Sequence, residues 1–257
     1  MDYEQFKAQV YVLTKIDLNS YKEKQMKRRI DSLIAKNNYS EYSEFIQAIK
    51  TNAELFEEFV NYLTINVSEF WRNPDQWKIL EEDVIPVLLK NKGKTLKVWS
   101  AACSTGDEPY SLVMLLSRYM PLSDIKILAT DIDKQVLERA VSGLYNEKSL
   151  TGLPKDLKEK FFTKVGLSNY QISEDIKKCV IFKQHNLLKD AYPEQLDLIV
   201  CRNVLIYFTD DAKLEIYKKF NKSLKTGGYL FVGSTEQIIN YKDINYSSFK
   251  SFFYIKN

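Results

Sequence analysis

The sequence has one histidine and three cysteines, and it contains no apolar run near the roughly 20 residues that a membrane-spanning helix needs. The single histidine, His185, excludes a histidine-rich metal centre, and we expect it to be structural. Cys103, Cys179 and Cys201 lack Cys-x-x-Cys spacing, so neither a disulfide framework nor a zinc site is expected. Residues 1–17 lack the continuous apolar segment of a signal peptide. We therefore expect a cytoplasmic protein that holds no metal and does not insert into membranes.

A strong charge of one sign is also absent. With 37 basic and 34 acidic residues, the net charge of +3 is too small to indicate a nucleic-acid partner by itself. The chain does have length and apolar content, because its 257 residues are 45% hydrophobic and 13% aromatic. These values suffice for more than one packed core, and they predict a large domain accompanied by a small one.

Residues 1–65 predict a small helical bundle, because apolar residues recur at spacings of three and four. The positions are Tyr3, Phe6, Val10 and Leu13, then Met26, Ile30 and Leu33, then Tyr42, Phe45 and Ile49, then Leu55, Phe59 and Leu63. A further helix is expected after Asn73, which can cap it, with Pro74 at the first helical position and Gln76 closing a capping box. Residues 66–95 are therefore predicted to link the bundle to the rest of the chain.

From residue 96 onward, short apolar strands alternate with amphipathic helices, as is typical of a parallel sheet wrapped by helices. The expected strands are 96–100, 125–130, 196–201, 229–233 and 249–255, and helices are expected from about 107, from about 134 and over 212–224, the last ended by Thr226-Gly227-Gly228. About 50 residues precede the strand at 196, too many for a simple connection. Within them, 161–165 and 180–183 predict a small antiparallel β insertion over about 146–184.

The first predicted strand runs into a tight loop of small residues, 101–109, which opens a helix. Small side chains let a backbone approach a ligand closely, here at the carboxyl edge of a parallel sheet where ligands usually bind. The loop lacks the glycine pattern of dinucleotide enzymes. Asp107 and Glu108 at the helix start would repel a pyrophosphate, whereas a zwitterionic cofactor bearing a sulfonium would be accepted. Alternatively, the two acids only complement the helix dipole.

Other polar residues are predicted at the same edge of the sheet. Asp131 ends the second strand, about 25 residues beyond Gly106, where a carboxylate can accept both ribose hydroxyls of an adenosine. The segment 185–188 precedes the strand at 196, and its Asn186 and backbone could contact an adenine edge. Residues 201–208 add a polar pair and Tyr207, although aromatic core packing would also explain Tyr207 and does explain Phe208. An adenosyl cofactor without phosphates fits this set best.

Five segments then stand in a familiar order and spacing: 66–72, 100–110, 129–133, 185–188 and 201–208. Through them the chain resembles the CheR-type chemotaxis receptor glutamate methyltransferases over essentially its whole length. The resemblance implies an α/β fold, a Rossmann-like S-adenosylmethionine-dependent methyltransferase sheet (96–257) with a small antiparallel β insertion, preceded by a small all-α domain (1–65) that docks on the receptor. It also implies S-adenosylmethionine as cofactor, S-adenosylhomocysteine as product, and the cytoplasmic methylation helices of chemotaxis receptors as partners.

The resemblance assigns roles position by position. The implied cofactor contacts are Asn66, Ser68, Arg72, Glu108, Asp131, Asn186, Leu187, Asn203 and Val204, with Glu108 at the amino-acid end and Asp131 at the ribose. Arg72 and Tyr207 are implied as the pair nearest the transferred methyl. Two departures keep their functional groups: Ser68 stands where many members have Thr, and Asp107 where many have Glu.

The implied reaction suits a site without histidine or metal. A glutamate side chain, with a reference pKa of about 4.3, is already ionised at neutral pH and can attack a sulfonium methyl without a general base. We expect Arg72 to orient that carboxylate and Tyr207 to position the methyl or the cofactor, although Arg72 could instead be a surface cation beside Glu69. Two other functions stay open: a methyltransferase acting on RNA or a small molecule, and a non-catalytic sensor of an adenosyl ligand.

Residues 21–30 form a helix segment that carries five cations around the core positions Met26 and Ile30. Such a run is usually only a solvated face. Because the resemblance implies a helical, acid-rich receptor substrate, we expect Lys24, Lys27, Arg28 and Arg29 to dock it. We expect no nucleic-acid partner and a monomeric protein.

Overall fold

The computed structural model describes residues 1–92 and 95–257, and the chain divides into two compact units. The first, the helical unit, comprises Met1–Asn66 together with Ile206–Glu215. The second, the sheet unit, comprises Val67–Leu205 and Ile216–Asn257. A short segment from late in the chain is therefore part of the N-terminal unit, which no local sequence pattern indicated.

The helical unit buries the apolar positions around a cluster of aromatic rings. Phe59 contacts Phe6 and Phe45 edge to face, with ring centroids 6.3 and 5.5 Å apart. Asp2 closes a capping box on the first helix, and the side chain of Asn52 caps the fourth. The helices are α1 (Tyr3–Thr14), α2 (Glu23–Lys36), α3 (Tyr42–Thr51) and α4 (Ala53–Thr64), with a 3-10 turn η1 (Leu18–Ser20).

The segment 206–215 joins this unit by backbone pairing. Tyr21 and Phe208 form an antiparallel bridge, and their rings stack with centroids 4.6 Å apart. The N–H of Lys22 donates to the carbonyl of Tyr207 at 2.9 Å, and the N–H of Thr209 donates to the carbonyl of Ser20 at 2.9 Å. The chain just before α2 thus holds the backbone of Tyr207 in place.

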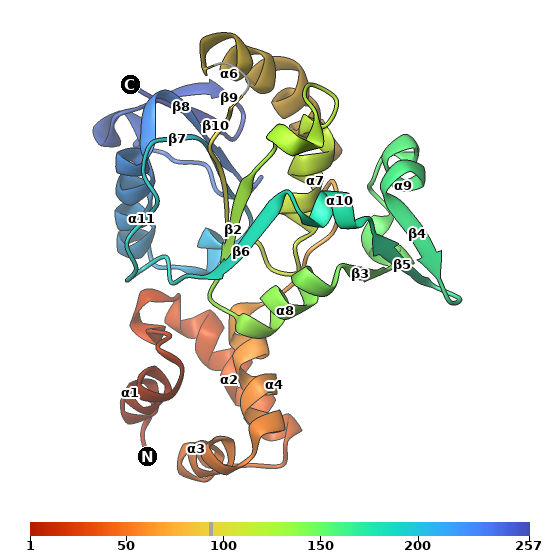
Figure 1. The fold of residues 1–257 in the computed structure, drawn as a ribbon. Coiled ribbons are helices and arrows are strands. Elements are labelled where there is room, and N and C mark those ends of the chain that lie inside the picture. The colour runs from red at the N-terminus through yellow and green to blue at the C-terminus, as the bar shows by residue number, and fades with distance from the viewer. Residues whose placement is uncertain (93–94) are drawn as a thin grey trace. The chain divides into compact units, whose positions relative to one another are not determined.

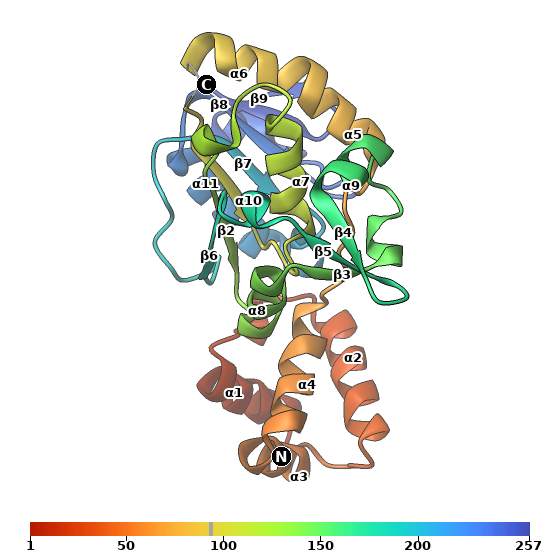
Figure 2. The ribbon, with the colours of Figure 1, turned by 45° about the vertical axis from the view of Figure 1, so that its right-hand side comes forward.

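The sheet unit is built on a seven-stranded sheet in the order β6-β2-β1-β7-β8-β10-β9 (Figures 1 and 2). Along the chain, helices alternate with its parallel strands. The pairs β6-β2, β2-β1, β1-β7 and β7-β8 are parallel, and β10 runs antiparallel to both of its neighbours. The strand order reverses at β1 and β7, so the carboxyl ends of these strands form the crevice where such sheets bind ligands. The strands are β1 (Val98–Ala101), β2 (Ile127–Asp131), β6 (Val180–Gln184), β7 (Leu196–Cys201), β8 (Leu224–Val232), β9 (Tyr246–Lys250) and β10 (Phe253–Lys256).

Helices cover both faces of this sheet (Figures 1 and 2). On one face, Tyr110 of α7 meets Phe182 of β6, with ring centroids 5.6 Å apart. On the other, Phe220 of α11 meets Trp99 of β1 at 5.5 Å. The longer helices are α5 (Pro74–Ile79), continued by π-helical residues Leu80–Val84 and by α6 (Ile85–Lys92), then α7 (Asp107–Leu116), α8 (Lys134–Ser142), α9 (Lys155–Phe161) and α11 (Asp210–Ser223).

The small antiparallel insertion is present, but one of its predicted strands is wrong. It comprises β3 (Leu144–Asn146), β5 (Asn169–Ile172) and β4 (Phe162–Val165), with Gly166 at φ +65° in the tight hairpin turn. Residues 180–183, predicted to pair within it, follow the short helix α10 (Glu174–Lys177) and form β6, parallel to β2 in the large sheet. β6 is an edge strand with Ile181 half exposed, so its sequence lacks the continuous apolar pattern of the inner strands.

Three local predictions also need correction. Asn73 precedes α5 with Pro74 at its start, but Asn73 makes no side-chain cap and Gln76 closes no capping box. Helix α11 ends at Ser223, so Thr226-Gly227-Gly228 lies inside β8. The segment 249–255 is divided between two antiparallel strands by a turn with Phe252 at φ +70°. Within residues 1–92 and 95–257, we find no helix long and apolar enough to cross a membrane.

Candidate active site

The loop that joins β1 to α7 has the backbone of a close-approach site. Ala102, Ser104 and Gly106 all adopt positive φ, at +62°, +48° and +88°. A Cβ on Gly106 would lie 2.8 Å from the Cβ of Ala140, so no other residue fits without displacing a neighbour. The requirement for glycine at this position therefore comes from packing against α8, whereas the close approach of a ligand to the loop stays a prediction.

Asp131, the last residue of β2, is buried, with 6% of its surface exposed. Its Oδ2 accepts the N–H of Ser104 at 2.8 Å, and its Oδ1 accepts the N–H of Asp133 at 3.0 Å. Burial raises the pKa of this carboxyl to about 6, against the lowering effect of these backbone donors. Because each carboxylate oxygen has two lone pairs, both oxygens keep acceptor capacity for the hydroxyls of a ligand.

Glu108 and Asp107 begin α7 in different surroundings. Glu108 accepts the Ser100 hydroxyl at 2.8 Å, and burial raises its pKa to about 6 although Arg202 and Ser100 lower it. Asp107 is 1% exposed, and burial also raises its pKa. One of its oxygens accepts the Thr105 hydroxyl, while Oδ1 has no hydrogen-bond partner in the described part of the chain. Such an orphaned buried acceptor is a place for a donor from a ligand.

Arg72 lies in a linker whose backbone is held tightly. Its carbonyl accepts the indole N–H of Trp77 at 3.0 Å and a guanidinium N–H of Arg202 at 2.7 Å. The residues on either side, Trp71 and Asn73, have positive φ of 58° and 60°. Left-handed backbone at such residues costs about 1–3 kcal/mol each and persists where the surroundings impose it. The half-buried Arg72 side chain donates only to the carbonyl of Val67, at 3.2 Å, among the described contacts.

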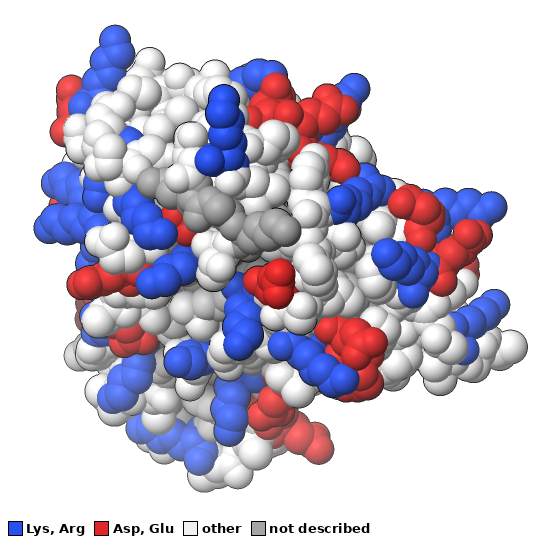
Figure 3. All heavy atoms as spheres, turned by 45° about the horizontal axis from the view of Figure 1, so that its top comes forward, with Lys and Arg blue, Asp and Glu red and all other residues white. Residues whose placement is uncertain are grey.

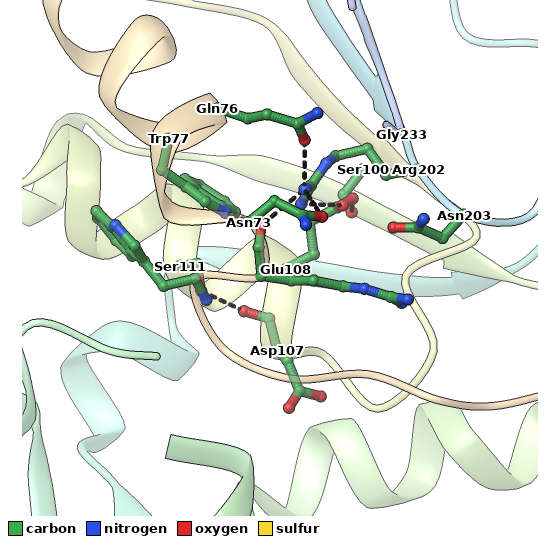
Figure 4. Close-up of polar contacts among 12 residues, drawn as sticks. Asn73, Gln76, Trp77, Ser100, Asp107, Glu108, Ser111, Arg202, Asn203 and Gly233 are labelled. Carbon is green, nitrogen blue, oxygen red and sulfur yellow. Dashed lines mark hydrogen bonds and ion pairs between the residues drawn. The ribbon is translucent and has the colours of Figure 1, made fainter. Parts of the chain in front are cut away.

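Packing on the sheet unit reinforces that backbone (Figure 4). The Trp71 ring stacks on Trp77, with centroids 4.9 Å apart and planes 20° apart. The Trp71 N–H donates to the Ser111 hydroxyl at 3.2 Å, and the Phe70 N–H donates to the carbonyl of Ser149 at 3.0 Å. The linker therefore presents the Arg72 side chain from a rigid support. Ser68, also half-buried, lowers the pKa of Asp107, which burial raises more strongly.

Asn203 and Val204 follow β7, and a carboxylate that the sequence analysis did not identify, that of Glu236, holds the backbone of this segment. Glu236 is buried, and its oxygens accept the N–H groups of Asn203 and Leu205 at 2.6 Å each, and that of Gly233 at 2.9 Å. Asn203 has φ +61°, and a Cβ on Gly233 would lie 2.5 Å from Glu236 Oε2. Because Glu236 is 33 residues beyond Asn203, no local motif could have indicated this contact.

Asn186 and Leu187 follow the edge strand β6. The backbone N–H of His185 donates to the carbonyl of Asp131 at 2.8 Å, which brings this segment to the end of β2. Asn186 Oδ1 accepts the N–H of Leu188 at 2.9 Å, and Leu187 is buried. Glu108, Asp131, Asn203 and this segment thus lie beyond the carboxyl ends of neighbouring parallel strands, where the sequence predicted them. Arg72, in the linker, joins them through the hydrogen bond between its carbonyl and Arg202.

Comparison with known proteins supplies the family. The model of the CheR methyltransferase SAM binding domain matches residues 66–253, and that of the CheR methyltransferase all-alpha domain matches residues 1–64. The chain belongs to the CheR methyltransferase family. Its cofactor is S-adenosylmethionine, and S-adenosylmethionine-dependent methylation in chemotaxis is the activity that membership carries.

Relatives cover most of this CheR methyltransferase. A chemotaxis protein methyltransferase of Listeria innocua is 46% identical over 241 residues, covering 94% of this chain and 92% of the relative. Another, of Borreliella burgdorferi, is 34% identical, covering 90% and 86%. Among solved structures, PKMT2 of Rickettsia typhi in complex with AdoHcy is 19% identical with a TM-score of 0.39, covering 65% of this chain and 26% of that one.

The residues of this CheR methyltransferase fit the chemistry of its cofactor. Glu108 and Asp107 provide buried carboxyl groups suited to a cationic ammonium, and Asp131 retains acceptors suited to ribose hydroxyls. The loop after β1 also lacks the glycine pattern that holds a pyrophosphate. Among the described residues, no group of three or more His, Cys, Asp or Glu side chains is placed to hold a metal.

Two predicted site residues of the CheR methyltransferase belong to the helical unit. Asn66 donates from Nδ2 to the Thr64 hydroxyl at 2.8 Å, next to the left-handed end of α4. Tyr207 is half-buried, and its carbonyl accepts the N–H of Lys22. The lone His185 packs edge-on against the rings of Trp99 and Tyr192, with centroids 5.4 Å from each, as a structural residue would.

The four predicted docking cations on α2 differ in how they are used. Lys27 pairs with Asp31 at 2.7 Å, an interaction that raises the pKa of Lys27, and Arg29 donates to the carbonyl of Tyr62 at 2.7 Å. Lys24 and Arg28 are exposed. A shallow hollow of about 470 Å³ runs along this face, lined by Lys24, Lys27, Arg28, Asp31, Ser32 and Ala35.

Proposed function

We propose that this CheR methyltransferase esterifies glutamate side chains on the cytoplasmic helices of chemotaxis receptors, with S-adenosylhomocysteine as the second product. The observation that supports this substrate is the linker arginine, Arg72. Its backbone is held by Trp77 and Arg202, while the residue is half-buried and its guanidinium has one hydrogen bond among the described contacts. A rigidly based guanidinium with remaining donors is suited to orient a carboxylate.

The protein's task in this reaction is positioning. The cofactor supplies a methyl group activated by attachment to a sulfonium. An ionised glutamate is already nucleophilic, so the site needs no general base, and alignment of reactants contributes up to about 7–11 kcal/mol in favourable systems. Arg72 orients the substrate carboxylate, and Tyr207, by its hydroxyl, places the reacting group. Asn66, Ser68, Glu108, Asp131, Asn186, Leu187, Asn203 and Val204 bind the cofactor.

The receptor substrate is proposed to dock on α2 through Lys24, Lys27, Arg28 and Arg29. Lys24 and Arg28 are exposed and available for long-range attraction of an acidic helix, while Lys27 and Arg29 shape the surface through contacts within the helical unit. The RNA alternative calls for a basic surface with stacking aromatics. On the face drawn in Figure 3, basic and acidic side chains are interspersed. Cytoplasmic location, a monomeric state and the docking role of residues 1–65 stay predictions.

One labelling experiment tests the proposal. The protein is incubated with methyl-labelled S-adenosylmethionine and receptor cytoplasmic fragments, and label is measured before and after mild alkali. Glutamyl methyl esters release the label in base. A second fragment with glutamines at the modified positions is the control, because an uncharged amide is not a nucleophile of this kind. Label that resists alkali, or equal labelling of the glutamine fragment, would contradict glutamate esterification.

A further inference from the structure

Arg202 is a buried cation that the sequence places just after β7 and to which no role was assigned. Its side chain is 2% exposed. One terminal nitrogen, Nη2, donates to the Arg72 carbonyl at 2.7 Å, to Gln76 Oε1 at 2.8 Å and to Asn73 Oδ1 at 3.3 Å. The other, Nη1, lies 3.7 Å from Glu108 Oε2. Figure 4 shows this guanidinium between the linker and Glu108.

The surroundings of the guanidinium are mostly apolar. Its central carbon lies 4.7 Å from the ring centroid of Phe231 and 5.7 Å from that of Trp77. Its Nε has no hydrogen-bond partner within residues 1–92 and 95–257. Burying such a cation carries a desolvation penalty that one carboxylate at 3.7 Å offsets only in part, so stability alone is a weak reason for it. A planar fork that reaches several acceptors at once is a property of arginine, which lysine lacks.

We propose that Arg202 is a positioning residue with two tasks: it fixes the linker from which Arg72 projects, and it supplies the positive charge that keeps Glu108 ionised. This inference rests on the proposed roles of Arg72 in catalysis and of Glu108 toward the cofactor's ammonium. The first task follows from the hydrogen bonds to the Arg72 carbonyl and to Gln76. The second follows from the ion pair with Glu108.

The charge around Glu108 comes from several elements. Arg202 after β7 and Arg72 in the linker favour its ionised form, as does the hydroxyl of Ser100 in β1. Glu236, after β8, opposes ionisation, and burial opposes it most, so that the pKa of Glu108 is about 6. Arg202 is the largest of the favourable influences. Without it, the pKa of Glu108 would rise, and a larger fraction of the carboxyl would be neutral near pH 7, which weakens its attraction for an ammonium.

The test compares Arg202→Met, Arg202→Lys and Lys225→Met, using S-adenosylhomocysteine affinity by calorimetry between pH 5.5 and 8.5. Lys225→Met is the matched control. Lys225, in β8, pairs at 2.8 Å with the buried Asp197, which lies near the start of β7, whereas Arg202 follows the end of β7. For Arg202→Met we expect at least tenfold weaker binding at pH 7 and a pH midpoint displaced upward. Lys225→Met should keep the wild-type midpoint even if it lowers the unfolding temperature.

Arg202→Lys separates the two tasks, since it retains a charge but loses the fork. We expect its pH midpoint to stay near that of wild type while kcat for receptor methylation falls about tenfold at saturating cofactor, and Gln76→Ala to lower kcat less. A folded Arg202→Met with the wild-type pH profile would overturn the charge role, and a folded Arg202→Lys with wild-type kcat would overturn the linker role. If Arg202→Met does not fold, the kcat of Arg202→Lys still decides the linker role. A pH midpoint of Arg202→Lys that differs from wild type would contradict the claim that positive charge alone keeps Glu108 ionised.

The binding measurements use no receptor, so they are independent of the proposed substrate. If the wild-type protein fails to label receptor glutamates while the Arg202 variants change the pH midpoint as expected, the proposed function fails and the charge role of Arg202 stands. The reverse outcome, receptor labelling with an unchanged midpoint, retains the proposed function and rejects that role.

Discussion

Charged side chains are used in opposite ways in the two units. In the sheet unit, Asp131 and Arg202 are buried, and each has designated partners at hydrogen-bond distance. In the helical unit, Lys24 and Arg28 project from α2 into solvent. Buried and fixed charges suit a small ligand bound in one pose, because they need no reorganisation. Exposed charges suit a large partner that arrives in many orientations, and they act mainly on the rate of encounter.

The largest expected effect, at the rigid end of this comparison, is that of Arg72→Ala. Turnover at saturating cofactor should fall at least about a hundredfold, since misplacement of a reacting group by 1 Å costs that much. S-Adenosylhomocysteine affinity should change less. The control is Arg118→Ala, which removes a surface arginine paired with Glu81 and Asp156. Methylation kinetics of both variants decide the matter, and an Arg72 variant with normal turnover would remove this residue from the catalytic role.

Asp131→Ala should act on cofactor binding. A hydrogen bond to a charged acceptor contributes about 1.5–3 kcal/mol, so calorimetry should show S-adenosylhomocysteine affinity reduced by roughly 10- to 150-fold. Turnover at saturating cofactor should be less affected. Asp210→Ala is a useful control, because that carboxylate is exposed and pairs only with Lys213 in the described contacts. Equal affinities for the Asp131 variant and wild type would contradict the ribose assignment.

Cofactor affinity should also depend on pH. The pKa values of Glu108 and Asp131 are both about 6 in the free protein, and binding favours their ionised forms. Affinity should therefore be constant above about pH 7 and fall as the pH drops through 6. The fall is up to about tenfold per pH unit for each carboxyl that must lose a proton when the cofactor binds. Titrations in buffers of different ionisation enthalpy should show proton release at pH 6. Affinity that rises on acidification would contradict this sign.

The same two carboxyls make the free protein less stable as pH rises, whereas they make it bind cofactor more tightly. The folded pKa of Asp131 lies above its unfolded value of about 3.9, and that of Glu108 above about 4.3, so the folded state binds more protons between about pH 4 and 6. Their contribution to stability is present below pH 4 and is lost as pH rises through 6. In the absence of cofactor, Asp131→Asn should therefore show a smaller loss of stability between pH 4.5 and 6.5 than wild type, measured by denaturant unfolding.

The smallest effect is expected at the exposed end of the comparison. Lys24→Glu combined with Arg28→Glu should raise the KM for a receptor fragment several-fold at low salt, and should reduce the salt sensitivity of methylation, because such charges act within a Debye length of about 8 Å at physiological salt. Cofactor affinity should not change. Lys155→Glu with Lys178→Glu, two exposed lysines of the sheet unit, is the charge-matched control. Wild-type efficiency at low salt in the α2 variant would reject the docking role.

Sequence reasoning succeeded where a signal was local. An acid at the tip of an apolar strand predicted the position of Asp131, and the change from helical to strand periodicity predicted the parallel sheet. It failed where partners are distant in the chain. Arg202 contacts a carbonyl 130 positions earlier, and Glu236 binds N–H groups up to 33 positions away. The edge strand β6 was assigned to the wrong sheet, because the sequence pattern of a partly exposed strand does not indicate which strand it pairs with.

The pairing of residues 20–22 with 207–209 bears on how such enzymes can be cut and recombined. A fragment that begins at residue 66 would keep the entire sheet unit but would lose the backbone partner of Tyr207 and the ring that stacks on Phe208. A chimaera that takes its first 65 residues from a relative would place a foreign segment against that tyrosine. Exchange of the N-terminal domain therefore requires two grafts, one at the amino end and one at 206–215, for the tyrosine to keep its native support.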